Sequence, residues 1–460
     1  MMYLALAVLV LAYPAFAAVR FARLPAAAKR NYWPMLRARL GWRRLCTATH
    51  LAYLDQHRRR KLRLRWPGST GTHVHAEAKP MMRHPVARFR PDEFGITARV
   101  KTIPDVGRAE IEGQADHLAN AWRCHRIQIA QPSPGRLLIR GLRTDPLAEP
   151  LSIDQAPPGV YETSGTVLPV SRVYLGLDEW GVHRFVSLAN ITGAVLAGQP
   201  GTGKTTLANS VLMQLSPSPA VQIAIADGQG GADFHSWRDR AFAYAGDDPA
   251  AGAAVLEDVH ALMRARFGCV LEVTGHRNAW HAGPTEAFPL VVLVVDEAGS
   301  YLALDDVKGQ PAAEKHVRTC RAMLSQLVRR GRSVMIFTVL ISQKPTSDQI
   351  PTQVRDNAAL RLCGAVQTVD AAVSVLGESI RSYPTVSPVA LSAPEDAGIF
   401  VAQLRTAGAP YVRLRVPDIT EADADERARL TAPLCRDPRS AIPALSAAPE
   451  NAPAAVPEHV

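Results

Sequence analysis

Three short apolar runs after residue 190 have the length and continuity of buried strands. They cover residues 191–197, 290–295 and 339–342. Strands without polar alternation are typical of a parallel sheet that is covered on both faces. Residues 207–213, just after the first run, are apolar at helical spacing. This alternation of strand and helix predicts an α/β domain with a parallel sheet over residues 165–418.

A smaller unit precedes this domain. Residues 95–100 alternate like a strand, and residues 108–122 have helical apolar spacing. Residues 125–129 and 137–140 read as two further strands around the turn at residues 132–135. The pattern predicts a small α+β domain over residues 71–150. A proline-rich stretch, residues 146–169, is expected to separate it from the larger domain.

The end of the chain has a different composition. Alanine, proline and serine dominate from Pro433 onward, and prolines recur often enough to interrupt any helix or strand. Such a segment cannot bury enough apolar surface to offset the entropy lost on ordering. We therefore expect residues 419–460 to form a disordered Ala/Pro-rich tail, with no compact domain after Arg415.

The chain is basic, and its excess charge is concentrated near the start. The net charge is +10 over 460 residues, which suggests a polyanionic partner or a membrane surface. Between Val19 and Trp66 there are fourteen arginines and lysines but one acid, Asp55. Residues 23–70 are therefore expected to form a solvated basic arm that lipid headgroups or nucleic acid could each neutralise. The six cysteines are scattered, which argues against a zinc site or a disulfide framework.

The stretch after the first apolar run fits the phosphate-binding pattern G-x-x-x-x-G-K-[ST]. Its glycines let backbone N–H groups turn toward phosphates at the positive end of the following helix. The lysine is expected to reach the β- and γ-phosphates of ATP, and the threonine hydroxyl after it to hold Mg²⁺. The residues are Gly198, Gln199, Pro200, Gly201, Thr202, Gly203, Lys204, Thr205 and Thr206.

Two acids follow the second apolar run. Asp296 and Glu297 stand at the carboxyl end of the predicted strand at residues 290–295. In doubly wound sheets that edge is where ligands bind. Asp296 is predicted to be the carboxylate associated with Mg²⁺, and Glu297 to orient the attacking water or accept its proton. The pattern predicts hydrolysis of ATP in addition to its binding.

The N-terminal residues predict a membrane anchor. Residues 3–19 carry no charge and are mostly leucine, alanine and valine, with Pro14 among them. This is the short end of the roughly 17–25 residues that span a bilayer. The basic block that follows predicts a single-pass anchor at residues 1–22, in the cell membrane, with the ATPase in the cytoplasm. A cleaved signal peptide ending near Ala17 and a merely peripheral segment are the alternatives. A signal peptide would lack a basic start and would export an ATPase away from ATP.

Several stretches between residues 171 and 416 form an ordered series of motifs around the two nucleotide-binding segments. They are residues 174–181, 263–266, 277–278, 296–302, 331–333, 339–345 and 357–361, together with Asp370. In this order they resemble the FtsK/SpoIIIE family of DNA translocases. The short, single-anchor layout is most similar to the conjugative-transfer (Tra) proteins of plasmids and integrative elements in filamentous high-GC bacteria. The resemblance implies a RecA-like P-loop motor, a homo-hexameric ring with ATP between subunits, and double-stranded DNA in the centre.

Three further residues are candidates for the reaction. Gln343 ends the third apolar run, so its amide could sense the γ-phosphate or orient water. Arg332 and Arg361 could complete the charge clamp of the transition state from a neighbouring subunit. Each arginine could equally have a structural role or face DNA.

The leading functional hypothesis is an ATP-driven double-stranded DNA translocase for transfer between cells. A DNA-segregation motor, an ATPase for protein secretion and a nucleotide-binding scaffold are the alternatives. A C-terminal winged helix, which reads DNA sequence in the chromosome-segregating members of the family, is not expected after Arg415. A separate partner could therefore supply DNA loading.

Overall fold

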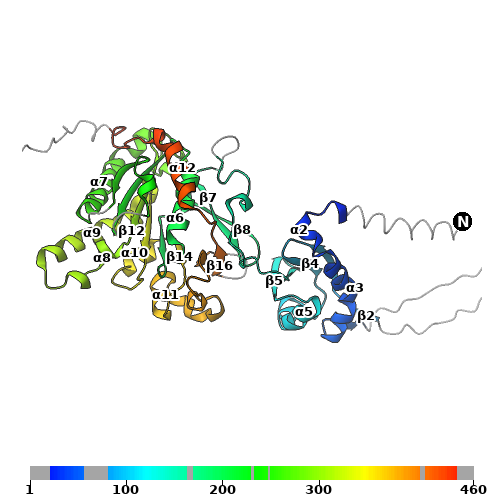
Figure 1. The fold of residues 1–460 in the computed structure, drawn as a ribbon. Coiled ribbons are helices and arrows are strands. Elements are labelled where there is room, and N and C mark those ends of the chain that lie inside the picture. Colours follow the sequence, from blue (N-terminus) through cyan, green and yellow to red (C-terminus); the bar gives the residue numbers. More distant parts are fainter. Residues whose placement is uncertain are drawn as a thin grey trace, which may run out of the picture. The chain divides into compact units, whose positions relative to one another are not determined.

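The computed structural model describes residues 21–55, 81–162, 169–228, 233–246, 249–404 and 410–442. The chain divides into two compact units between Pro146 and Leu147 (Figure 1). Each unit has its own hydrophobic core.

The first unit contains a four-stranded antiparallel sheet in the order β3-β4-β6-β5. Its strands are β3 (Val86–Pro91), β4 (Gly95–Lys101), β5 (Arg126–Ser133) and β6 (Arg136–Leu142). Its helices are α2 (Ala26–Lys29), α3 (Tyr32–Ala48), α4 (Arg108–Glu112) and α5 (Ala115–Trp122). Strands β1 (Tyr53–Asp55) and β2 (Met81–Arg83) form a separate pair. The single helix expected at residues 108–122 is therefore two short helices.

Helix α3 belongs to the core of this unit, which corrects the expected solvated arm at residues 23–70. Met35, Ala38, Trp42 and Cys46 recur at helical spacing and are buried. The Trp42 ring meets Phe89 of the sheet edge to face, with centroids 5.8 Å apart. The arginines occupy the outer side of the helix, so the count of charges concealed an apolar stripe. The small domain thus begins well before residue 71; residues 56–80 lie outside the described part.

The second unit is built on one large sheet. In the described residues it has ten strands, in the order β11-β10-β12-β13-β9-β14-β15-β16-β7-β8. The strands from β11 to β14 are parallel, whereas each later pair is antiparallel. The sheet is therefore mixed and not wholly parallel as expected.

The bounds of these elements fix which residues reach the carboxyl edge of the parallel strands. The strands are β7 (Arg172–Asp178), β8 (His183–Ser187), β9 (Gly193–Ala197), β10 (Val221–Asp227), β11 (Ala241–Ala245), β12 (Leu290–Asp296), β13 (Ile336–Ser342), β14 (Leu360–Cys363), β15 (Ile399–Ala402) and β16 (Val412–Arg415). The helices are α6 (Lys204–Leu215), α7 (Pro249–Thr274), α8 (Gly299–Leu302), α9 (Pro311–Arg330), α10 (Thr352–Asn357), α11 (Val369–Leu376) and α12 (Glu421–Thr431). Helix α12 packs beside α6, and α7 packs beside α9 (Figure 1). Every residue of β10, β12 and β13 is buried, as strands covered on both faces require.

The segment after residue 418 is folded as far as Ile442, which corrects the expected tail at residues 419–460. Thr420 caps α12 by accepting a hydrogen bond from the backbone N–H of Asp423. Ala424 and Ala428 are buried against the core of the second unit. The composition suggested that the entropy lost on ordering would keep this segment disordered. The cap and the buried alanines offset that loss. Residues 443–460, the rest of that prediction, lie outside the described part.

The proline-rich stretch also belongs to the second unit. Leu147 and Leu151 are buried, and Leu151 forms a β-bridge with Pro417. The Tyr161 hydroxyl lies 2.7 Å from the Ser210 hydroxyl on α6. The second unit therefore begins at Leu147, whereas the predicted domain began at residue 165, and it extends beyond residue 418.

In the described ranges, no helix combines the length and the apolar character that crossing a membrane requires. The predicted anchor covers residues 1–22, and residues 1–20 lie outside those ranges. The anchor therefore stays a prediction.

Candidate nucleotide site

The phosphate-binding pattern forms a loop between β9 and α6 at the carboxyl edge of the sheet. Gly198, Gly201 and Gly203 have φ angles of +152°, +75° and +89°, which other residues rarely adopt. A Cβ atom on Gly203 would also lie 3.1 Å from the backbone nitrogen of Gly398. Glycine is therefore required here both for conformation and for space. The loop leads directly into α6 at Lys204, so the amino end of that helix points to the loop.

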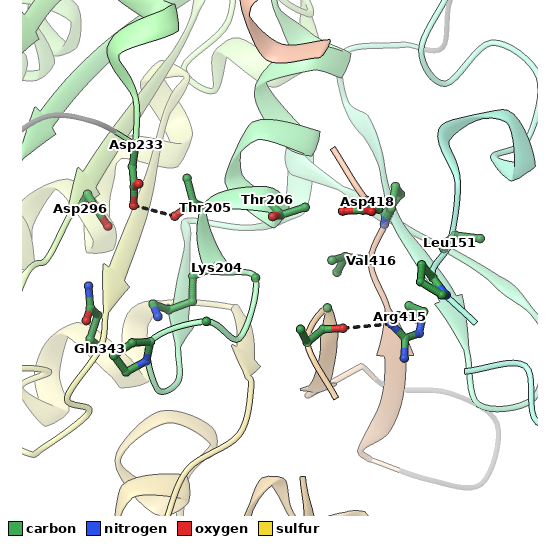
Figure 2. A pocket seen from close by; sticks show the side chains of 17 residues that line it. Leu151, Lys204, Thr205, Thr206, Asp233, Asp296, Gln343, Arg415, Val416 and Asp418 are labelled. Carbon is green, nitrogen blue, oxygen red and sulfur yellow. Dashed lines mark hydrogen bonds between the residues drawn. The ribbon is translucent and has the colours of Figure 1, made fainter. Parts of the chain in front are cut away.

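Lys204 and Thr205 are both positioned by groups around the loop. Lys204 is only 7% exposed, and its Nζ donates a hydrogen bond to the Gln199 carbonyl at 2.9 Å. Burial lowers the pKa of Lys204, whereas the nearby carboxylates of Asp296, Glu297 and Asp233 oppose that shift. The Thr205 hydroxyl donates to Oδ2 of Asp233 at 2.9 Å (Figure 2).

Asp296 ends β12, where it is paired in register with Asp227 at the end of β10. Asp296 is 4% exposed and Asp227 is 1% exposed. Burial, followed by the Asp227 charge, raises the pKa of Asp296 to about 7. Its buried Oδ2 has no hydrogen-bond partner among the described residues. A buried carboxylate oxygen without a partner fits the need of a Mg²⁺ ion for oxygen ligands.

Glu297 is held beside Gln343 through the backbone. Its Oε2 accepts a hydrogen bond from the Gln343 N–H at 3.2 Å. Burial raises the pKa of Glu297, which moves it toward the range of an effective general base. Glu297 has a φ of +39°, a strained value for a residue other than glycine and one that recurs at functional sites. Gln343 follows β13, the strand between the phosphate-loop strand and the acidic strand, so it lies between the two halves of the site.

The phosphate loop, Lys204 and Asp296 line a cavity of about 560 Å³ (Figure 2). Glu297 lies behind Gln343 and does not line this cavity itself. Lys204, Asp233, Asp296 and Gln343 line one side of it. The opposite side comes from the antiparallel strands and the segments joined to them, with Leu151, Gly398, Arg415, Val416 and Asp418. The volume is within the range of sites for small ligands and cofactors.

Arg415 is the principal cation on that opposite side. It is 7% exposed, and it donates to the Leu147 carbonyl at 2.7 Å and to the Ala397 carbonyl at 2.9 Å. These bonds fix the guanidinium at the cavity wall, where it can attract an anionic ligand.

The sequence analysis missed Asp227, Asp233 and Arg415. Asp227 follows residues 221–226, which are apolar except for Gln222, so nearly the same signal that identified Asp296 was present. Asp233 stands in a connecting segment without such a pattern. Arg415 reaches the cavity only through the pairing of the antiparallel strands, which local spacing does not specify.

The two candidate arginine fingers do not line this cavity. Arg332 is exposed in the short helical turn Gly331–Val334 just before β13, so it lies at the opposite edge of the sheet. Arg361 is half-buried within β14, and its Nε donates to the Ala358 carbonyl at 3.0 Å. A role in a neighbouring subunit's site stays a prediction for both.

Comparison with solved structures establishes the fold. The pCW3 conjugation coupling protein TcpA, in its monomer form with ATPγS, superposes with a TM-score of 0.50 at 17% identity. The match covers 76% of this chain and 94% of TcpA. The likeness shows a shared fold, a mostly parallel α/β sheet with a phosphate-binding loop after β9. The predicted α/β fold is thereby confirmed in its main features.

Two other similar structures have lower TM-scores. The cytoplasmic domain of the type VII secretion ATPase EccC from Thermomonospora curvata has a TM-score of 0.45 at 17% identity, over 63% of this chain and 33% of EccC. VirB4 from Thermoanaerobacter pseudethanolicus has a TM-score of 0.30 at 13% identity, over 58% of this chain and 99% of VirB4. No family model matches the sequence. No curated protein matches it either.

Proposed function

We propose that this protein hydrolyses ATP with Mg²⁺ and uses the energy to move double-stranded DNA, in transfer between cells. The observation that carries the ATPase part is the cavity itself. It joins a phosphate-binding loop, a buried lysine, a carboxylate oxygen without a partner, and a glutamine that the candidate base holds in place.

Each residue has a distinct part in this chemistry. The backbone N–H groups of residues 198–203 and the amino end of α6 bind the phosphates, and Lys204 neutralises the β- and γ-phosphates. Thr205 and Asp296 would hold Mg²⁺, which supplies positive charge to the phosphate oxygens as they gain electron density. Glu297 orients the attacking water and accepts its proton, because its raised pKa makes it a stronger base than an exposed glutamate.

Gln343 links the base to the nucleotide. Because its N–H donates to Glu297 and its side chain lines the cavity, a change at the γ-phosphate can alter the position of the base. This arrangement suits an enzyme in which the nucleotide state controls a mechanical step.

The DNA part of the proposal rests on charge and on the motif order. The net charge of +10 favours a polyanionic substrate. The motif order resembles that of DNA translocases, and the fold is similar to that of a conjugation coupling protein. A homo-hexameric ring, a membrane anchor at residues 1–22 with the motor in the cytoplasm, and a separate DNA-loading partner complete the proposal.

The test is ATP hydrolysis measured without polymer, with duplex DNA and with single-stranded DNA. Lys204→Ala provides the blank, because it removes the charge that binds the phosphates. We expect duplex DNA to stimulate hydrolysis more strongly than single-stranded DNA. Absence of stimulation by either polymer would overturn the DNA part and favour a protein substrate, while the ATPase assignment would stand.

A further inference from the structure

The first unit has a basic sheet face that the nucleotide chemistry does not use. Strands alternate between two faces, and Phe89, Ala98 and Ile139 face the core. Arg88, Arg99 and Leu138 are in register on the opposite face, with Lys101 and Arg136 paired one step along it. We name Arg88, Arg99, Lys101 and Arg136 the basic sheet face. All four are exposed.

These charges are arranged at a cost to the fold. Arg88 is directly opposite Arg99, and Lys101 is directly opposite Arg136. Like charges in such cross-strand pairs destabilise a sheet. Within the described ranges, none of the four side chains makes an ion pair or a side-chain hydrogen bond. The carboxylate of Asp92 accepts hydrogen bonds from Thr97 and Arg140, and from none of these four cations.

The basic sheet face is also hollowed. Its four cations lie around a cavity of about 540 Å³ whose wall is mostly apolar, formed by Val86, Val100, Pro132, Leu137 and Leu138. A hollow lined by several cations fits a ridge of negative charge, such as the phosphate backbone of a nucleic acid. None of the described residues that line it is aromatic. Proteins that bind single strands stack bases on aromatic rings, so the chemistry favours a duplex.

A membrane surface fits the other side of the same unit better. Trp33 and Leu40 on α3 are 64% and 76% exposed, and Arg37 and Arg44 lie at helical spacing beside them. Exposed tryptophan and leucine among arginines are typical of contact with a bilayer interface. Since α3 packs on the core side of the sheet, the basic sheet face is directed away from that helix.

We infer that the basic sheet face binds the phosphate backbone of double-stranded DNA, as a second contact separate from the ATPase unit. The inference deepens the proposed function and rests on it. Its four side chains contact phosphates without reading sequence. The first unit would thereby keep hold of DNA independently of the nucleotide state.

The experiment measures binding of the full-length protein to a labelled 40-base-pair duplex without nucleotide, over a range of salt concentrations. The test variant is Arg88→Gln/Arg99→Gln/Arg136→Gln. The matched control is Arg37→Gln/Arg39→Gln/Arg44→Gln, which removes the same charge from exposed positions on α3.

We expect the test variant to bind on the order of 100-fold more weakly at 0.1 M salt, with its logarithmic salt slope reduced by about 3, because each phosphate contact contributes about 0.9. The control should bind the duplex like the unchanged protein. Thermal melting should show that the test variant folds, since it removes like-charge pairs. A single Arg99→Gln variant, which relieves the Arg88 pair, should reduce the slope by about 0.9.

Equal losses in the test and control variants would overturn the inference, because general charge would then explain binding. An unchanged test variant would also overturn it while leaving the translocase proposal intact. A test variant that loses binding to phosphatidylcholine vesicles with one quarter phosphatidylserine, but keeps duplex binding, would assign the face to lipid instead. If the unchanged protein bound no duplex, both this inference and the DNA part of the proposed function would fail.

Discussion

Asp227 and Asp296 stand opposite each other at the carboxyl ends of two paired parallel strands, and both are buried. Two carboxylates so placed repel each other when both are ionised, and burial removes the water that would screen them. The fold therefore keeps a concentration of negative charge next to the phosphate loop. Without a cation, the repulsion between these two carboxylates destabilises the fold. A divalent cation bound there would be attracted by both negative charges.

Asp296→Asn should stabilise the protein in the absence of nucleotide and Mg²⁺. The folded-state pKa of Asp296, about 7, lies above the ordinary value of 3.8, so folding at pH 8 must bury a charge. The melting temperature of the variant should exceed that of the unchanged protein by a few degrees, which corresponds to about 1–2 kcal/mol. The gain should be constant above pH 7 and shrink as the pH falls from 7 toward 4. Thermal melting in EDTA at several pH values measures it, and a lower melting temperature at pH 8 would contradict the account.

Glu297→Gln should separate binding from turnover. The amide keeps the size of the side chain and can still accept from the Gln343 N–H, but it cannot accept a proton from water. ATP should bind with nearly unchanged affinity while turnover falls by about 10²–10⁴-fold. Nucleotide binding and single-turnover hydrolysis measure the two effects. A variant that hydrolysed ATP normally would show that another group is the base.

Arg415→Ala should weaken both the fold and nucleotide binding. It leaves the Leu147 and Ala397 carbonyls without this donor, which should lower the free energy of unfolding by about 1–3 kcal/mol. It also removes a fixed cation from the cavity wall, so the affinity for ATP should fall. Chemical denaturation and nucleotide titration test the two parts, and unchanged affinity for ATP would confine Arg415 to a structural role.

Two truncations test the folded C-terminal segment. Removing residues 419–460 should lower the free energy of unfolding by at least about 2 kcal/mol. It deletes buried Ala424, Ala428 and Ile442, and it removes the Leu434 carbonyl that accepts from Gln222. Removing residues 443–460 alone is the matched control, and it should leave the melting temperature unchanged. Equal stability of the two truncated proteins would show that α12 contributes little.

The parts of the site that could be predicted from sequence are those encoded by local spacing. Lys204 follows a glycine pattern that only one backbone geometry accommodates, and Asp296 follows a run of apolar residues that only a buried strand tolerates. Gln343 was found by the same strand-end signal. For these residues the neighbouring sequence contains nearly all of the relevant physics.

The remaining features depend on contacts between distant segments. Arg415 reaches the cavity because β16 pairs with β15 and β7, and those pairings are not encoded near residue 415. The apolar side of α3 was not predicted because arginines dominate the composition of this segment. Trp42 and Cys46 nevertheless face the core. Helix α12 has a polar composition, and only its fit against the motor reveals its buried alanines.

The hydrogen bond from Arg415 to Leu147 has a mechanical consequence. One guanidinium touches the wall of the nucleotide cavity and also holds the first residue of the motor, immediately after the chain leaves the small unit. The first residue of the second unit is thus held at the place where ATP would be gained and lost. A ligand that shifted this guanidinium would therefore shift the backbone at Leu147 as well.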